Sequence, residues 1–93
     1  MFRYIFIDIY KKENQVIIKI KDNAGGVPNN IINRIFEPYF TTKHKAQGTG
    51  IGLHMSQEII SRHINGTLEV DNTTYTYKSK SYTGAVFTIS LPL

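Results

Sequence analysis

The sequence predicts a two-layer α+β sandwich. Two observations support this class. Near both ends of the chain, side-chain types alternate with a period of two residues, which is the pattern of a strand. In residues 53–65 the apolar side chains recur at the spacing of a helix. The predicted order is strand, strand, helix, loop, helix, strand, strand, without repeats or linkers. At 93 residues, the chain is one small domain or part of one.

Two strands are predicted at the start of the chain, over residues 2–10 and 16–21, with a polar turn between them. Isoleucines share one face of the first strand and mainly aromatic side chains share the other, so this strand requires cover on both faces. Along the second strand, the alternation places Asp22 on the apolar side, where an unpaired carboxylate is costly. Alternatively, the strand ends at Lys21 and Asp22 caps the following turn.

Two helices are predicted in the middle of the chain. The first covers residues 28–36, because Pro28 suits a first helical turn and isoleucines follow at helical spacing. Residues 41–52 form a polar, glycine-bearing loop. The second and clearer helix covers residues 53–65, and Asn65-Gly66 is a typical stop at its C-terminus.

The remaining residues predict a return to strands. Residues 67–70 read as a strand and residues 84–91 as a closing strand, with Phe87 on one face and Thr88 on the other. The polar segment between them, residues 71–83, is expected to be a loop or an irregular hairpin.

Composition excludes several classes of protein. The chain has no cysteine, which excludes disulfide scaffolds, thiolate metal sites and cysteine nucleophiles. No apolar run approaches the roughly 18 residues that a membrane-spanning helix needs. The first residues lack the pattern of a signal peptide, so the expected compartment is the cytoplasm.

The basic charge lies in the first half of the chain. Residues 1–49 hold 8 basic and 4 acidic side chains, residues 50–93 hold 3 of each, and the net charge is +4. Such an excess fits either a solvated basic face or an anionic partner. Nucleic acid is not the expected partner, because the basic residues form no stripe with interleaved aromatic side chains.

Five of the seven glycines lie between Gly25 and Gly52, in two clusters. Glycine clusters mark places where backbone approaches a neighbour closely. The second cluster precedes a helix, so its free N–H groups suit phosphate oxygens, and a flexible hinge is the alternative.

These segments resemble the ATPase domain of sensor histidine kinases. Residues 22–28 (Asp-Asn-Ala-Gly-Gly-Val-Pro) look like its first glycine box, residues 35–43 (Ile-Phe-Glu-Pro-Tyr-Phe-Thr-Thr-Lys) like its phenylalanine box, and residues 48–53 (Gly-Thr-Gly-Ile-Gly-Leu) like its second glycine box. The phenylalanine box separates histidine kinases from related gyrases, mismatch-repair proteins and heat-shock chaperones. The resemblance covers nearly all of residues 1–93 and implies an incomplete Bergerat-type fold.

The resemblance also implies an ATP site. Asp22 would accept a hydrogen bond from the adenine amino group, and Gly26 would leave room for the base. Phe36 and Phe40 would anchor a lid over residues 41–49. The residues implied for the phosphates are Lys43, Gly48, Thr49, Gly50, Gly52 and Leu53, and Thr88 is the weakest candidate, for a water-mediated contact with adenine.

Two features of the family are not found in this sequence. Residues 1–21 have the period of strands, so they do not supply the helix whose asparagine binds Mg²⁺, and Mg-ATP is expected to bind weakly or not at all. The three histidines, His44, His54 and His63, lack the context of a phosphate acceptor and are expected to be ordinary surface or packed residues. The chain alone is therefore not expected to phosphorylate itself.

The resemblance implies ATP or ADP as the ligand, and in the parent kinase a histidine-bearing dimerisation domain and a response regulator as partners. Any membrane anchor would belong to that parent. The alternative is a non-catalytic remnant that dimerises and binds nucleotide weakly or not at all. Self-association is expected through the strand at residues 2–10 or through the bare helical face.

Overall fold

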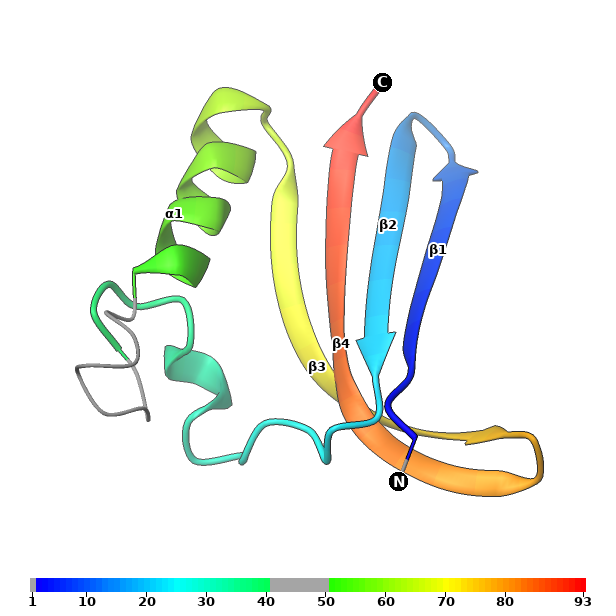
Figure 1. The fold of residues 1–93 in the computed structure, drawn as a ribbon. Coiled ribbons are helices and arrows are strands. Elements are labelled where there is room, and N and C mark those ends of the chain that lie inside the picture. The colour runs from blue at the N-terminus through cyan, green and yellow to red at the C-terminus, as the bar shows by residue number, and fades with distance from the viewer. Residues whose placement is uncertain (1, 41–50) are drawn as a thin grey trace.

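Four strands form one antiparallel sheet in the computed structural model, which describes residues 2–40 and 51–93. The strand order is β1-β2-β4-β3, and α1 lies against one face near β3 (Figure 1). The bounds are β1 Ile5–Lys12, β2 Gln15–Asp22, β3 Thr67–Tyr77 and β4 Lys80–Pro92. The predicted two-layer α+β class is confirmed, with the sheet as one layer and the helical segment as the other.

The helical layer consists of α1, Gly52–Glu58, followed directly by a π-helical turn, η3, at Ile59–His63. It ends where the sequence predicts, because Asn65 takes a φ of 59° and the Gly66 N–H donates to the Ile60 carbonyl over 2.8 Å. Gln57 ties the helix to the sheet by donating from Nε2 to the Leu68 carbonyl over 3.3 Å. No helix among the described residues is long and apolar enough to cross a membrane.

The first predicted helix is wrong. Within residues 28–36 the structure has turns and a single 3₁₀ turn, η1, at Ile32–Arg34. Prolines bracket only nine residues, Asn29 to Glu37, and three of these are β-branched isoleucines. Nor does a side chain cap the N-terminus of η1. So short a segment does not recover the cost of nucleating an α-helix.

Of the two expectations for residues 71–83, the loop is wrong and the hairpin is correct, because β3 and β4 run through this segment as one long, regular hairpin. Its turn is Lys78-Ser79, and its tip bends away beneath the sheet (Figure 1). Tyr75 and Tyr77 stack edge-on against Phe6, with ring centroids 5.8 and 4.8 Å apart. The segment is polar in composition, but its tyrosines recur at every second residue and cover the aromatic face of β1.

The two faces of the sheet are covered unequally. On the face turned away from α1, the aromatic rings pack on one another and the Lys21 ammonium lies 4.1 Å from the Tyr75 ring centre. On the face towards α1, Leu68 and Ala85 are buried, but the β1 isoleucines are 62–70% exposed. The buried core is therefore small: Leu68 and Ala85 lie on the face towards α1, Ile17 is buried on the opposite face of β2, and β1 lies outside the cover of α1.

Candidate functional site

The carboxylate of Asp22 lies at the end of β2 and is held by backbone. β2 includes Asp22, so the predicted parity is confirmed: this side chain shares a face with Ile18 and Ile20. Its Oδ1 accepts from the Ala24 N–H over 3.0 Å and from the Ala85 N–H over 3.1 Å. The alternative is wrong in ending the strand at Lys21, although Asp22 does cap the turn at Ala24 as that alternative expected.

The second oxygen of this carboxylate, Oδ2, accepts no hydrogen bond from the residues that the structure describes. A carboxylate offers about four lone-pair sites, and only Oδ1 is engaged here. Two backbone donors therefore fix the carboxylate, and within residues 2–40 and 51–93 nothing donates to its second oxygen, which suits a donor on a ligand.

Close contacts position the backbone of Asp22. The Tyr75 hydroxyl donates to the Asp22 carbonyl over 2.6 Å. Gly84 of β4 lies against the same residue, since a Cβ built on Gly84 would lie 2.8 Å from Asp22 Oδ1 and closer still to its carbonyl group. Only glycine permits this approach of β4 to β2.

The next residue, Asn23, is buried and joins the site to the start of the chain. Its Nδ2 donates to the Phe2 carbonyl and its Oδ1 accepts from the Tyr4 N–H, each over 2.9 Å. Both polar atoms of its side-chain amide therefore have hydrogen-bond partners, so burying this side chain costs little free energy. Asn23 thus fixes the residues before β1 beside Asp22.

Gly25 and Gly26 have φ values of 92° and 82°, in the region that favours glycine. The Gly25 N–H donates to the Thr83 carbonyl over 2.9 Å. The side-chain amide of Asn72 then binds both backbone groups of Val27, because Oδ1 accepts from its N–H and Nδ2 donates to its carbonyl, each over 2.7 Å. A Cβ on Gly26 would lie 2.6 Å from Asn72 Oδ1.

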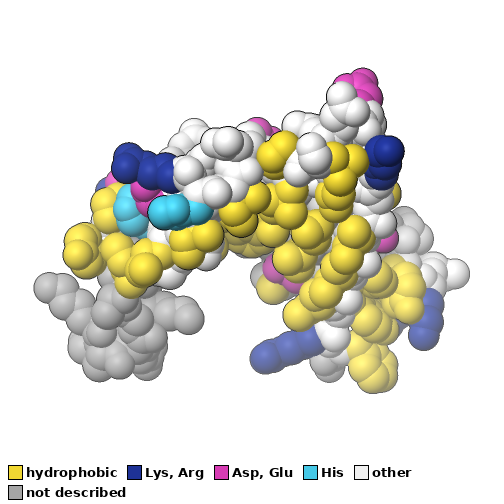
Figure 2. Space-filling view, turned by 90° about the horizontal axis from the view of Figure 1, so that it is seen from above, with side chains coloured by type: hydrophobic (Ala, Val, Ile, Leu, Met, Phe, Trp, Pro, Cys, Tyr) yellow, Lys and Arg dark blue, Asp and Glu magenta, His cyan; other side chains and the backbone are white. Residues whose placement is uncertain are grey.

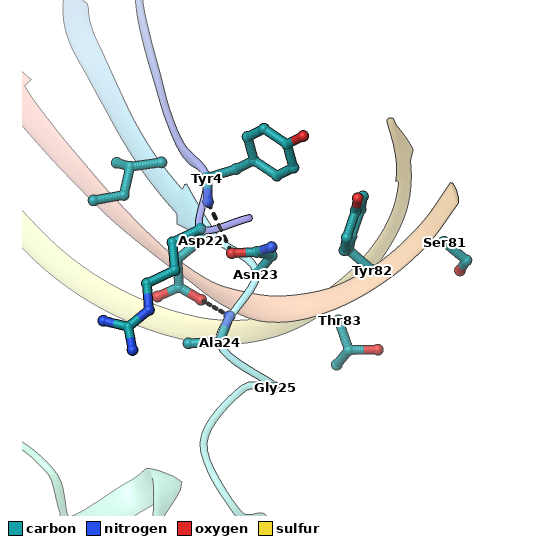
Figure 3. A pocket seen from close by; sticks show the side chains of 10 residues that line it. Tyr4, Asp22, Asn23, Ala24, Gly25, Ser81, Tyr82 and Thr83 are labelled. Atoms are coloured by element: carbon teal, nitrogen blue, oxygen red, sulfur yellow. Dashed lines mark hydrogen bonds between the residues drawn. The ribbon is translucent and has the colours of Figure 1, made fainter. Parts of the chain in front are cut away.

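A pocket of about 730 Å³ opens beside these residues. Figure 3 shows Asp22, Asn23 and Ala24 along the turn after β2, with Tyr82 and Thr83 of β4 near them. Arg3 and Asp22 both line the pocket, so it offers a guanidinium as well as a carboxylate. It is large enough to hold a nucleobase.

The phenylalanine box packs against β4 and α1. The Phe36 ring lies edge-on to Phe87, with centroids 6.4 Å apart, and the Phe36 carbonyl lies 3.2 Å from His54 Nδ1. A carbonyl only accepts, so the tautomer with its proton on Nδ1 makes this bond. His54 is therefore a packed residue that joins the box to the helix.

Phe40 and Glu37 make local contacts around Arg34. The Arg34 guanidinium lies 4.6 Å from the Phe40 ring centre, and its Nε lies 3.4 Å from Glu37 Oε2. The pairing of Glu37 with Arg34 favours a structural role for this carboxylate within the box.

The structure brings only some of the expected site residues together. Asp22 and Gly26 lie in one backbone cluster, whereas Thr88 lies on the face of β4 opposite to that of Phe87, away from α1. Gly52 and Leu53 begin α1 and are exposed. The expected residues Lys43, Gly48, Thr49 and Gly50 lie outside the described residues. Within residues 2–40 and 51–93, no group of three or more His, Asp or Glu side chains is arranged to hold a metal ion.

Four residues that position the site were not identified from the sequence: Asn23, Asn72, Tyr75 and Gly84. For Gly84 a signal existed, because an isolated glycine within a strand pattern indicates a close backbone approach. Nothing in the sequence pairs Asn72 with Val27, 45 residues earlier.

Residues 3–93 match the family described as histidine kinase-, DNA gyrase B- and HSP90-like ATPase, and the chain belongs to this family. The resemblance noted in the sequence is thereby confirmed. The nucleotide-free catalytic domain of histidine kinase ThkA superimposes with a TM-score of 0.74 at 27% identity. This superposition covers 97% of the chain and 53% of that domain.

Several relatives are sensor kinases. Sensor histidine kinase ZraS of Salmonella typhimurium is 42% identical over 90 residues, which are 94% of this chain and 17% of that protein. Sporulation kinase A of Bacillus subtilis is 40% identical over 86 residues, 92% of this chain and 12% of that protein. The chain therefore spans a small part of these relatives and about half of a kinase catalytic domain.

Proposed function

We propose that the chain is the ATP-binding portion of a two-component sensor histidine kinase. The observation that carries this proposal is the Asp22 carboxylate, with Oδ1 held by two backbone N–H groups and Oδ2 available beside a pocket. Such a carboxylate is a rigid acceptor of fixed orientation. The exocyclic amino group of adenine is a donor that fits it.

The other residues divide between the base and the phosphates. The family motif also assigns Gly26 to the base, while its missing Cβ makes room for the side chain of Asn72. The backbone of residues 48–53 and the Lys43 ammonium bind the triphosphate. Phe36 and Phe40 anchor the lid over residues 41–49. Mg²⁺ neutralises phosphate charge when it is bound, and its protein ligand comes from outside the described residues.

The catalytic reaction belongs to a longer parent protein. There, ATP phosphorylates a histidine on a dimerisation domain, and a phosphorelay passes the group to a response regulator in the cytoplasm. Phosphoryl transfer depends mainly on positioning and charge stabilisation. The role of this chain is to bind and orient the nucleotide, and by itself it is inactive as a kinase.

A second candidate function is a non-catalytic module that dimerises and binds nucleotide weakly or not at all. It is favoured by one observation: the β1 isoleucines on the face towards α1 are 62–70% exposed. A surface of this kind favours self-association.

Calorimetric titration of the chain with ATP and ADP, with and without Mg²⁺, tests the first candidate. Asp22→Asn is the informative variant, because it keeps the Oδ1 acceptor and replaces Oδ2 with a donor that opposes the adenine amino group. We expect it to weaken binding by about 10- to 100-fold, which corresponds to one lost hydrogen bond to a charged group.

Asp8→Asn is the matched control, since Asp8 is exposed in β1, and it should leave the affinity unchanged. Equal affinity of the Asp22→Asn variant and the wild type would overturn the adenine assignment. A folded chain that binds no nucleotide under any condition would support the second candidate.

A further inference from the structure

We infer that Asn72 is a positioning residue that sets the preference of the site for adenine, because it supports the Asp22 carboxylate from two sides. The inference rests on the proposed function and deepens it: Asp22 makes the hydrogen bond to the base, and Asn72 fixes the direction in which Asp22 presents Oδ2. Asn72 acts through Asp22 and does not bind the nucleotide.

The direction of Oδ2 matters because of the surface from which Asp22 projects. Asp22 shares its face of the sheet with Ile18 and Ile20, whose side chains offer no hydrogen bonds. Figure 2 shows hydrophobic side chains gathered over the strands. On such a surface a base is selected by the group that it presents to the carboxylate. A site built around one hydrogen bond discriminates strongly against a ligand that cannot make that bond.

The first support runs through the turn after β2. Asp22 Oδ1 accepts from the Ala24 N–H over 3.0 Å, so the carboxylate moves with this turn. The two glycines that follow have no side chains that could pack, and their φ values are 92° and 82°, so hydrogen bonds have to hold this backbone in place. At the far end of the turn, the Asn72 amide holds Val27 by two bonds of 2.7 Å.

The second support runs through β4. The same Oδ1 accepts from the Ala85 N–H over 3.1 Å. In the ladder between β3 and β4, Ala85 is the residue directly opposite Asn72. The backbone of Asn72 therefore supports one donor to the Asp22 carboxylate, and its side chain supports the segment that carries the other donor.

The Asn72 amide also fills the space beside the first glycine box. A Cβ on Gly26 would lie 2.6 Å from Asn72 Oδ1, so the amide occupies the volume that a side chain at residue 26 would need. Loss of the amide would leave a void there and two unpaired backbone groups at Val27. The turn could then shift, and because Ala24 moves with it, the carboxylate would rotate.

The test compares ATP with the triphosphate of purine riboside, which has a hydrogen atom in place of the adenine amino group. Calorimetric titration of the wild-type chain should give tighter binding of ATP. Asn72→Ala should lower the ratio of the two affinities about tenfold, because a misaligned carboxylate loses most of the benefit of one charged hydrogen bond. A loss of stability alone would weaken the binding of both nucleotides equally and leave the ratio unchanged.

Two further variants make the ratio interpretable. Gln57→Ala is the matched control, because it removes one hydrogen bond of 3.3 Å to the Leu68 carbonyl, and it should leave the ratio unchanged. Asn72→Asp serves where Asn72→Ala does not fold, since it keeps an acceptor for the Val27 N–H and loses only the donor to the Val27 carbonyl. It should lower the ratio by a smaller factor, and its added charge acts equally on two nucleotides that carry the same triphosphate.

Amide hydrogen exchange tests the support of the turn without nucleotide. The Val27 N–H should be protected in the wild type and should exchange about tenfold faster in Asn72→Ala. Unchanged protection of Val27, or an unchanged ratio of affinities where the wild type prefers ATP, would overturn the inference and leave the proposed function standing. Wild-type affinities that are equal for the two nucleotides, or undetectable, would overturn the adenine assignment itself and this inference with it.

Discussion

Asn72 of β3 binds both backbone groups of Val27, with its Oδ1 and Nδ2 each 2.7 Å from their partners. A side-chain amide that pairs in this way takes the place of a neighbouring strand. It fixes the backbone after Gly26, at the point where the chain leaves the sheet. The conformation of the first glycine box thus depends on a residue 45 positions away.

Asn72→Ala should lower the free energy of unfolding by about 1–3 kcal/mol, because the Val27 N–H and carbonyl both lose their partner. Urea denaturation measures the change. Asn29→Ala is the control, since the side-chain contact of Asn29 within the described part of the chain is a long one, 3.5 Å to Asn72 Nδ2, and the change should shift stability by no more than about 0.5 kcal/mol. Similar losses in both variants would show that the Val27 bonds are not the cause.

The contrast between Asp22 and Asn72 shows which parts of the site the sequence could predict. The side chain of Asp22 could be assigned to one face of the strand and to a family motif, because both assignments depend only on residues close to it in the sequence. Asn72 could not be placed, because its function depends on how two distant segments meet, and its short polar side chain suits loops equally well. Lys43 stays a prediction, since it lies outside the described residues.

The fold was predictable where local periodicity was undisturbed. β2 and the stop of the helical segment at Asn65 match the sequence pattern within one or two residues. Residues 71–77 form a strand because their tyrosines pack on Phe6 and Tyr4, a long-range contact that overrides the loop-like composition. Residues 28–36 remain turns for a local reason, because the segment between the two prolines is too short to recover the cost of nucleating an α-helix.

Gly84→Ala should destabilise the chain by about 1–3 kcal/mol, because an added methyl group meets the backbone of Asp22 and forces β4 away from β2. Gly52→Ala is the matched substitution, since a Cβ at Gly52 meets nothing within 4 Å and alanine favours helices. Thermal unfolding of both variants gives the comparison. Equal melting temperatures would mean that the contact between the strands relaxes without cost.

Stability should fall at alkaline pH, because the pKa of Tyr75 is raised above its ordinary value of 10.0. The largest cause is partial burial of the phenol, and the charges of Asp22 and Tyr82 add to it. The folded state then holds the phenol proton more tightly than the unfolded state. This contribution is present below about pH 10 and is lost as pH rises through the raised pKa. Unfolding free energies between pH 8 and 12 measure the slope.

Tyr75→Phe should reduce this alkaline slope and also lower stability at neutral pH, because its hydroxyl donates to the Asp22 carbonyl. Burial also raises the pKa of Tyr82, and the neighbouring Tyr4 adds to this shift. The double variant Tyr75→Phe/Tyr82→Phe should therefore have a still flatter dependence of stability on pH. A profile of Tyr75→Phe that runs parallel to the wild type would contradict this origin of the slope.

The tip of the long hairpin offers a stabilising change. Lys78 and Ser79 have φ values of 49° and 66°, which is the left-handed conformation at both central positions of a tight turn. This conformation costs residues with a Cβ roughly 1–2 kcal/mol each, and Asn-Gly is the pair that suits it. Replacing Lys78-Ser79 with Asn-Gly should therefore raise the free energy of unfolding by about 0.5–1 kcal/mol after the entropy cost of glycine. Ser81→Gly, placed within β4 two residues further on, should instead lower stability, because glycine weakens a strand interior. Urea denaturation of the two variants should move the midpoints in opposite directions. If both variants lowered the midpoint, the strain at the turn would not be relieved by glycine.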